Sequence, residues 1–129
     1  MMKQYVGLIS LLVADYDEAI AFYTQKLGFD LLEDSPQGEK RWVVVRPKGA
    51  VETAILLAKA SNEQQKQQIG HQSGGRVFLF LNTDDFWRDH QRMQQQGIKF
   101  LETPRQEAYG TVAVFEDLYG TRWDLLQLN

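Results

Sequence analysis

The sequence contains no cysteine among its 129 residues. This absence excludes disulfides, thiolate metal sites and cysteine nucleophiles, and it fits a reducing compartment such as the cytoplasm. The chain also lacks a basic excess, because 14 Lys and Arg stand against 17 Asp and Glu and the net charge is -3. Without such an excess, we expect no nucleic-acid partner.

A long hydrophobic run is also missing. The longest strongly apolar stretch, Val6 to Ala14, is far shorter than the roughly 20 residues of a membrane-spanning helix. The N-terminus does not show the basic-then-apolar pattern of a signal peptide. We therefore expect a cytoplasmic protein with no membrane partner. A hydrophobic content of 43% over this length is typical of one globular domain.

The first sixty residues carry the pattern of a βαβββ module. An almost continuously apolar run over 5–13 predicts a strand that is buried on both faces. Asp15, with Glu18 three residues later, predicts the start of a helix, and Gly28 predicts its end. Turn residues separate three further predicted strands, over 29–34, 41–46 and 53–58.

A second set of elements repeats this order after a polar, glutamine-rich connection. The connection has no apolar stripe, so we expect a loop with one or two helical turns there. A shift of 69 residues then aligns Gly28 with Gly97 and Glu33 with Glu102, which indicates a duplication. The predicted second module has a strand over 76–81, a helix over 84–96, and strands over 98–102, 111–116 and 122–127.

These repeats predict an α+β fold within a single domain. It consists of module one (1–60), the connection (61–75) and module two (76–129). Each module is too small to bury a sheet face by itself. We therefore expect the two βαβββ modules to form paired curved mixed sheets around a shared cavity, where a ligand would bind.

Two segments also carry a family resemblance. The first runs over 12–29 and includes Asp15-Tyr16-Asp17 at the predicted helix start. The second runs over 113–125 and includes Glu116-Asp117-Leu118-Tyr119-Gly120. Together they resemble the module signatures of the vicinal oxygen chelate superfamily, which contains glyoxalase I, extradiol dioxygenases and bleomycin-resistance proteins. The resemblance implies a homodimer, but it leaves the function open because the superfamily hosts enzymes and plain binding proteins.

The enzymes of this superfamily hold a divalent metal at up to four strand positions. The resemblance places these positions at Leu8, at Ile55 or Leu56, at Arg76 and at Asp124. Aliphatic side chains have no donor atom for a metal, and a guanidinium group only donates hydrogen bonds. One remaining carboxylate does not make a catalytic metal site. We therefore predict that the chain uses no metal and no other cofactor.

Two of these positions carry opposite charges. Period-two alternation on neighbouring strands places Arg76 and Asp124 in the predicted cavity, where we expect an ion pair. The pair could open for an anionic or polar ligand, because the planar guanidinium group suits a carboxylate or a phosphate. The alternative is a structural salt bridge that fills a vestigial site.

Further candidate ligand-binding residues are planar or aromatic side chains on the predicted strands, and one histidine in the connection. Flat molecules are often bound by such groups, although core packing is the alternative for each strand residue. His71 could reach over the mouth of the cavity from its loop. The strand candidates are Arg41, Trp42, Tyr109 and Phe115.

Two functions remain open at this point. The first is a metal-free protein of the bleomycin-resistance type, which binds a small molecule with a polar or anionic end and a flat or apolar body. The second is a lyase, isomerase or dioxygenase of the same superfamily with a non-standard site, in which Asp124 or His71 would act as the acid-base group. The missing ligands favour the first, and catalytic activity is left undecided.

Overall fold

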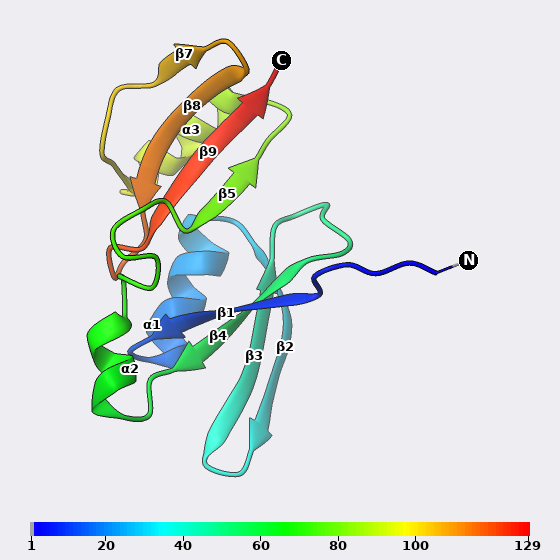
Figure 1. Ribbon diagram of the computed structural model, residues 1–129, viewed down its shortest axis with the longest axis vertical. Coiled ribbons are helices and arrows are strands. Elements are labelled where there is room, and N and C mark those ends of the chain that lie inside the picture. The colour runs from blue at the N-terminus through cyan, green and yellow to red at the C-terminus, as the bar shows by residue number, and fades with distance from the viewer. Residues whose placement is uncertain (1) are drawn as a thin grey trace. The chain divides into compact units, whose positions relative to one another are not determined.

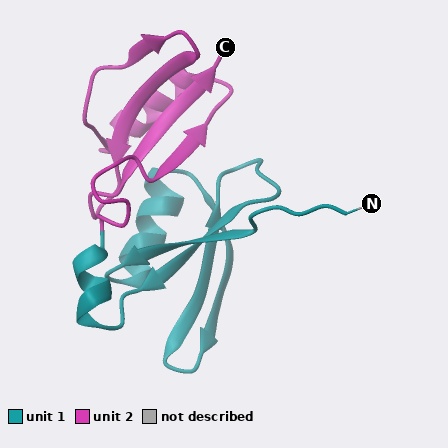
Figure 2. Cartoon of the chain, viewed as in Figure 1, with its two compact units in different colours: residues 1–69 teal, residues 70–129 magenta. Residues whose placement is uncertain are grey.

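A computed structural model describes residues 2–129, which fall into two compact units (Figure 2). Unit 1 ends at Ile69 and unit 2 begins at Gly70, so the boundary lies inside the predicted connection. Each unit contains one mixed sheet and at least one helix (Figure 1). The predicted α+β class with two mixed sheets is confirmed, while the shared cavity stays a prediction.

Unit 1 is a four-stranded sheet with the order β1-β4-β3-β2. The pair β1 and β4 is parallel, and the other two pairs are antiparallel. In chain order, the elements are β1 (Leu8–Val13), α1 (Tyr16–Ala21), the π-helical turn η1 (Phe22–Lys26), β2 (Asp30–Gln37), β3 (Lys40–Arg46), β4 (Ala54–Lys59) and α2 (Glu63–Gln68).

The helix of unit 1 begins as predicted and ends in a wider turn. The Asp15 carboxylate accepts a hydrogen bond from the Glu18 amide at 2.9 Å, which caps α1. The chain leaves η1 at Gly28, whose φ of 83° is readily adopted only by glycine. One sheet face packs against this helix, and the fully buried side chains between them are Tyr23 of η1 and, from the sheet, Leu11, Val13, Val43, Val45 and Leu57.

The first strand differs from its prediction at its start. Tyr5 and Val6 lie before β1 and are 59% and 64% exposed, and Leu8 at the start of β1 is also exposed. The reason is that β1 is an edge strand with β4 as its neighbour, and only one of its faces packs against the helix. An apolar run therefore does not by itself indicate burial on both faces.

Unit 2 repeats the strand order of unit 1. Its sheet runs β5-β9-β8-β6, with β7 also paired to β8, and its first and last strands again form the parallel pair. The elements are β5 (Leu79–Asn82), α3 (Phe86–Gln95), β6 (Lys99–Phe100), β7 (Arg105–Glu107), β8 (Gly110–Glu116) and β9 (Arg122–Leu128).

The strand predicted over 98–102 is shorter than expected. Strand β6 stops at Phe100, and the Glu102 side chain accepts a hydrogen bond from the Val114 amide at 3.1 Å. The Leu101 amide still donates to the backbone oxygen of Val114 at 2.8 Å, and the Glu102 carboxylate then takes the place of a backbone acceptor for β8 until pairing resumes in β7.

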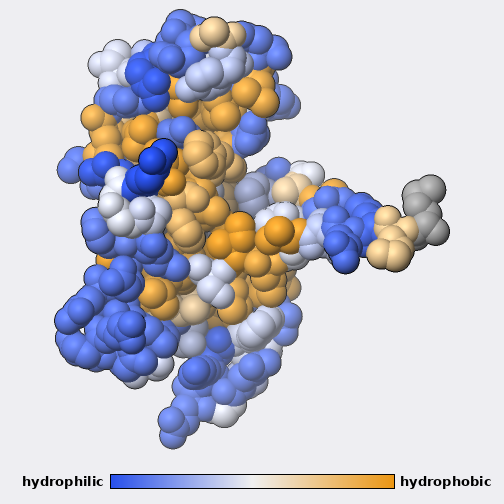
Figure 3. Space-filling model, viewed as in Figure 1, coloured by the Kyte–Doolittle hydropathy of each residue, from blue (hydrophilic) through white to orange (hydrophobic). Residues whose placement is uncertain are grey.

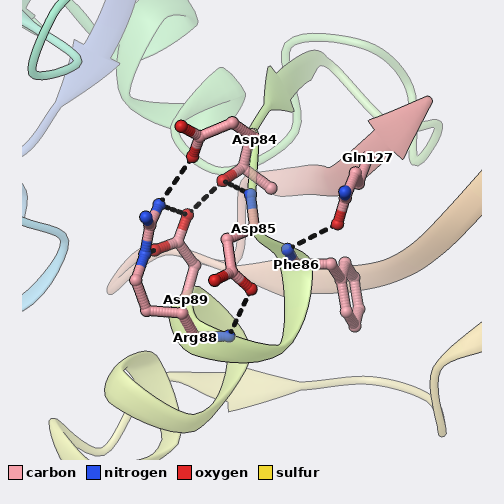
Figure 4. Close-up of polar contacts among 7 residues, drawn as sticks. Asp84, Asp85, Phe86, Arg88, Asp89 and Gln127 are labelled. Carbon is pink, nitrogen blue, oxygen red and sulfur yellow. Dashed lines mark hydrogen bonds and ion pairs between the residues drawn. The ribbon is translucent and has the colours of Figure 1, made fainter. Parts of the chain in front are cut away.

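The start of α3 is fixed to the sheet by polar contacts (Figure 4). The Asp85 carboxylate accepts a hydrogen bond from the Arg88 amide at 3.1 Å, and Arg88 forms ion pairs with Asp84 and Asp89 at 2.9 Å each. The Phe86 amide donates to the side-chain oxygen of Gln127 at 2.8 Å. Because Gln127 lies on β9, this bond aligns the helix with the central strand.

The two faces of the unit 2 sheet have different surroundings. Helix α3 lies behind β8 and β9 in Figure 1 and covers one face, where Phe86, Met93, Phe115 and Leu125 are fully buried. Alternate residues point to the other face, which we call the open face of unit 2. It is defined by Phe80, Val114, Asp124 and Leu126.

No helix among the described residues 2–129 is long and apolar enough to cross a membrane.

Candidate functional site

The open face of unit 2 combines an aromatic ring with a carboxylate. Strand register places Asp124 of β9 between Phe80 of β5 and Val114 of β8, and cross-strand partners share a face. The Phe80 side chain is 60% exposed, whereas Asp124 and Val114 are half-buried. Figure 3 shows hydrophobic side chains next to hydrophilic ones on the surface of this unit.

The Asp124 carboxylate is only partly solvated. Its Oδ1 atom is shielded from solvent and accepts no hydrogen bond. Burial raises the pKa of Asp124, Arg105 lowers it, and Glu102 raises it further. Burial has the largest effect because the charged form loses its hydration. The sheet therefore holds a carboxylate whose negative charge is not fully compensated.

Arg105 is the positively charged residue that acts on the pKa of Asp124, but it forms its ion pairs with other carboxylates. Arg105 forms ion pairs with Glu102 at 3.0 Å and with Glu107 at 3.4 Å. Hydrogen bonds to Glu102 and, more weakly, to Tyr109 hold the pKa of Arg105 above its usual value. The guanidinium group of Arg105 therefore stabilises the β7–β8 hairpin and its flank, and it forms no ion pair with Asp124.

The predicted ion pair between Arg76 and Asp124 is absent from the described residues. Arg76 is exposed and lies three residues before β5, while Phe80 is the residue paired with Asp124. Arg76 lies in the bend before β5, where its amide donates a hydrogen bond to the backbone oxygen of Ser73, so it does not occupy the strand position opposite Asp124.

The helix caps point to a different residue for this position. Asp15 and Asp85 are the caps, and Leu8 lies seven residues before Asp15. Counting seven residues back from Asp85 gives Phe78, which is the position equivalent to Leu8. The prediction used Arg76 because it took the residue that directly follows Gly74 and Gly75 as the start of the strand, whereas β5 begins at Leu79.

Two other candidates lie on helix-covered faces. Arg41 of β3 forms ion pairs with Asp17 at 2.9 Å and Asp34 at 2.7 Å, and its guanidinium group lies over the Tyr16 ring. These contacts join the β2–β3 hairpin to α1, so they are structural. Phe115 is fully buried and stacks on Trp123 at a ring distance of 5.9 Å, which makes it part of the core of unit 2.

The remaining candidates are at least partly exposed to solvent. Trp42 alternates with Arg41 on β3, so it points to the face of unit 1 that α1 does not cover and is half-buried. Tyr109 is exposed in the turn between β7 and β8, next to Arg105. His71 is exposed in the turn that follows Gly70.

Sequence reasoning missed Glu102 and Arg105. Both act on Asp124, but Glu102 was predicted as the end of a strand and Arg105 follows the predicted turn around Pro104, so neither was expected near Asp124. The available signal was the opposite charge of two residues three positions apart, which is weak in a chain with 24% charged residues.

A scan for known families matches the Glyoxalase/Bleomycin resistance protein/Dioxygenase superfamily over residues 5–125. The chain belongs to this superfamily. The resemblance found in the sequence is thereby confirmed.

Relatives of known sequence or structure cover nearly the whole chain. An uncharacterized protein of Shewanella frigidimarina is 64% identical over 130 residues, which span 99% of this chain and 96% of the relative. The crystal structure of UcmS2 is similar with a TM-score of 0.85 and 31% identity, covering 97% of this chain and 98% of the other. The crystal structure of TnmS3, an antibiotic binding protein from Streptomyces sp. CB03234, has a TM-score of 0.82 and 33% identity, covering 100% and 99%.

The superfamily's metal does not fit the residues present. Leu56, which pairs with Ser10, points to the face of unit 1 opposite α1, so it occupies the second ligand position in place of the buried Ile55. With Leu8 and Phe78 at two further positions, only Asp124 offers an oxygen. Across residues 2–129, no three His, Asp or Glu side chains gather in a way that could hold a metal ion.

Proposed function

We propose that this superfamily member binds a small molecule on the open face of unit 2 without a metal ion. The observation that carries the proposal is the exposed Phe80 ring beside the half-buried Asp124 carboxylate. An exposed aromatic ring next to a polar group with an unsatisfied atom is typical of a binding surface for flat molecules. The similarity to TnmS3, an antibiotic binding protein, supports the same class of function.

The proposal extends to the setting in which the protein works. We propose a cytoplasmic homodimer that does not bind nucleic acid, on the basis of the missing cysteine, the net charge of -3 and the family. Static light scattering of the purified chain measures the dimer directly. A mass of one chain at micromolar concentration contradicts it.

Titration calorimetry with flat antibiotics of either charge tests the binding function. Daunorubicin, which carries an amine, and novobiocin, which is an acid, serve as probes. We expect at least one of them to bind, and we expect Phe80→Ala to weaken this binding by about tenfold, which corresponds to about 1.4 kcal/mol. A loss of this size is reasonable for an aromatic platform.

Trp87→Ala is the matched control. Trp87 is 55% exposed on α3, away from the open face, so its removal deletes a similar exposed ring without touching the proposed site. Binding should stay within about twofold of the unmodified protein. Equal losses in the two variants, or no binding of either antibiotic, contradict the proposal.

A second candidate function rests on the raised pKa of Asp124. A carboxyl group that is protonated at higher pH than usual is suited to general acid-base chemistry, which the enzymes of this superfamily would require. Mass spectrometry of the antibiotic after incubation separates the two functions. Intact recovery supports binding alone, whereas a changed mass supports an enzyme.

A further inference from the structure

Asp124 forms no ion pair among the described residues, although two arginines of unit 2 lie in its region. Arg105 lowers the pKa of Asp124 but is itself held in ion pairs by Glu102 and Glu107. Arg122 precedes Asp124 by two residues on β9 and donates a hydrogen bond to the backbone oxygen of Gly75 at 2.9 Å. Arg76, which was expected to neutralise Asp124, lies in the bend before β5.

The side chains next to Asp124 do not compensate for the missing ion pair. Its neighbours across the strands are the aromatic Phe80 and the aliphatic Val114, and neither supplies a hydrogen-bond donor from its side chain. The Oδ1 atom is shielded and unsatisfied, which costs free energy in a folded protein. A bound group that brings positive charge or a donor would recover part of that cost.

The Phe80 ring also favours a positively charged ligand. The face of an aromatic ring carries partial negative charge and attracts cations, particularly where water is excluded. An anionic group bound here would instead meet the unpaired charge of Asp124, because the positive charge of Arg105 is already paired with Glu102 and Glu107. Both features disfavour an anion.

We infer that the open face of unit 2 selects a flat aromatic cation, whose amine or amidine group faces Asp124 while its ring stacks on Phe80. This inference rests on the proposed function and names its ligand class. It replaces the anionic end expected from the sequence, because that expectation depended on Arg76 being in the site.

Fluorescence titration with two small probes of opposite charge tests the inference. Proflavine is a flat aromatic cation, and 8-anilinonaphthalene-1-sulfonate is an aromatic anion of similar size. We expect the unmodified protein to bind proflavine at least tenfold more tightly than the anionic probe. Equal or tighter binding of the anionic probe overturns the inference.

Asp124→Asn and Asp84→Asn form a matched pair of variants. Both remove one negative charge, but Asp84 is exposed at the start of α3, outside the open face. We expect Asp124→Asn to weaken proflavine binding by tenfold or more and Asp84→Asn to change it by less than twofold. Equal effects of the two variants overturn the inference, because they would indicate general charge attraction only.

The same titrations distinguish a failure of the inference from a failure of the proposed function. If the anionic probe binds and Phe80→Ala abolishes its binding, the face binds flat molecules but does not select cations, so only the inference fails. If neither probe nor either antibiotic binds, both fail. Circular dichroism of Asp124→Asn confirms that a loss of binding does not reflect unfolding.

Discussion

The two units share a strand order but differ in what their uncovered faces carry. In unit 1, Ser10 of β1 pairs with Leu56 of β4, and in unit 2 the equivalent pair is Phe80 of β5 with Asp124 of β9. The topology of the pair is the same, and of these four residues only Asp124 carries a charge. Topology therefore gives two similar surfaces, and the side chains decide which of them can recognise a polar molecule.

The helices of the two units differ by one residue. From Asp15 to Gly28 the chain takes 13 steps, and from Asp85 to Gly97 it takes 12. Unit 1 accommodates the additional residue in the π-helical turn η1, whereas α3 of unit 2 is a regular α-helix. The duplication thus preserved the ends of the helix and changed its interior.

Replacement of Phe86 by alanine should give the largest difference between the units. Phe86 begins α3 and is fully buried, and its equivalent Tyr16 begins α1 with 9% of its side chain exposed. We expect Phe86→Ala to lower the free energy of unfolding by about 3–5 kcal/mol, because it leaves a cavity in the core. Tyr16→Ala should cost less, since its ring lies at the edge of the core of unit 1.

Urea unfolding followed by circular dichroism measures both changes. A larger loss for Tyr16→Ala than for Phe86→Ala would contradict the packing difference between the units.

The two units also differ at the first residue of the strand that precedes the last one, which is Lys40 of β3 in unit 1 and Gly110 of β8 in unit 2. A Cβ atom at Gly110 would lie 2.1 Å from the backbone oxygen of Gln127, so Gly110→Ala forces β8 away from β9. We expect a loss of about 2–3 kcal/mol. In unit 1 the corresponding first residue of β3 is the exposed Lys40, and Lys40→Ala should change stability by less than about 0.5 kcal/mol. Thermal unfolding compares the two, and an unchanged Tm for Gly110→Ala would refute the close approach.

The caps of the two helices should behave alike. Asp15 accepts a hydrogen bond from the Glu18 amide, and Asp85 accepts one from the Arg88 amide. Asp15→Ala and Asp85→Ala should each cost about 1 kcal/mol, while the asparagine variants retain most of the stability. Chemical denaturation of all four variants tests this symmetry. It fails if one alanine variant is neutral.

The response to mildly acidic pH should be confined to unit 2. Both histidines, His71 and His90, belong to it. Burial lowers the pKa of His90, whose Nε2 atom is shielded and lacks a hydrogen bond, and the ring packs against Phe86 and Phe100. The unfolded chain, with a histidine pKa of about 6.5, then takes up the proton first as the pH falls. Stability is complete above this value and declines as the pH falls below it toward the folded pKa.

Tm measured between pH 5 and 7.5 checks this decline. His90→Phe should flatten the profile, because it removes the imidazole whose pKa burial lowers. A profile that keeps its slope in His90→Phe would assign the effect to another group.

The secondary structure could be predicted from the sequence more accurately than the arrangement of the candidate site. Asp15, Gly28 and Gly97 mark helix ends through local backbone requirements, so they could be located from the sequence. Asp124 was also placed correctly on its strand, because alternation is a local property. The ion pair with Arg76 failed because the strand was expected to begin directly after Gly74 and Gly75, whereas the chain forms a bend at Arg76 and pairs with β9 only from Leu79.

Burial was equally hard to assign to single aromatic residues. Phe115 and Phe80 both lie on predicted strands of the second module, yet one is in the core and the other is exposed. The difference depends on which face α3 covers, and this follows from the tertiary contact between Phe86 and Gln127. No local pattern contains that information.

The parallel pairing of the first and last strands has a consequence for the order of synthesis. In each unit the strand made last, β4 or β9, lies in the interior of the sheet, between the first strand and the strand made just before the last. While the ribosome is still producing β9, β5 has no neighbour to pair with, and the same holds for β1 until β4 is made. Neither unit can therefore complete its sheet before its final strand has been synthesised, which favours late folding.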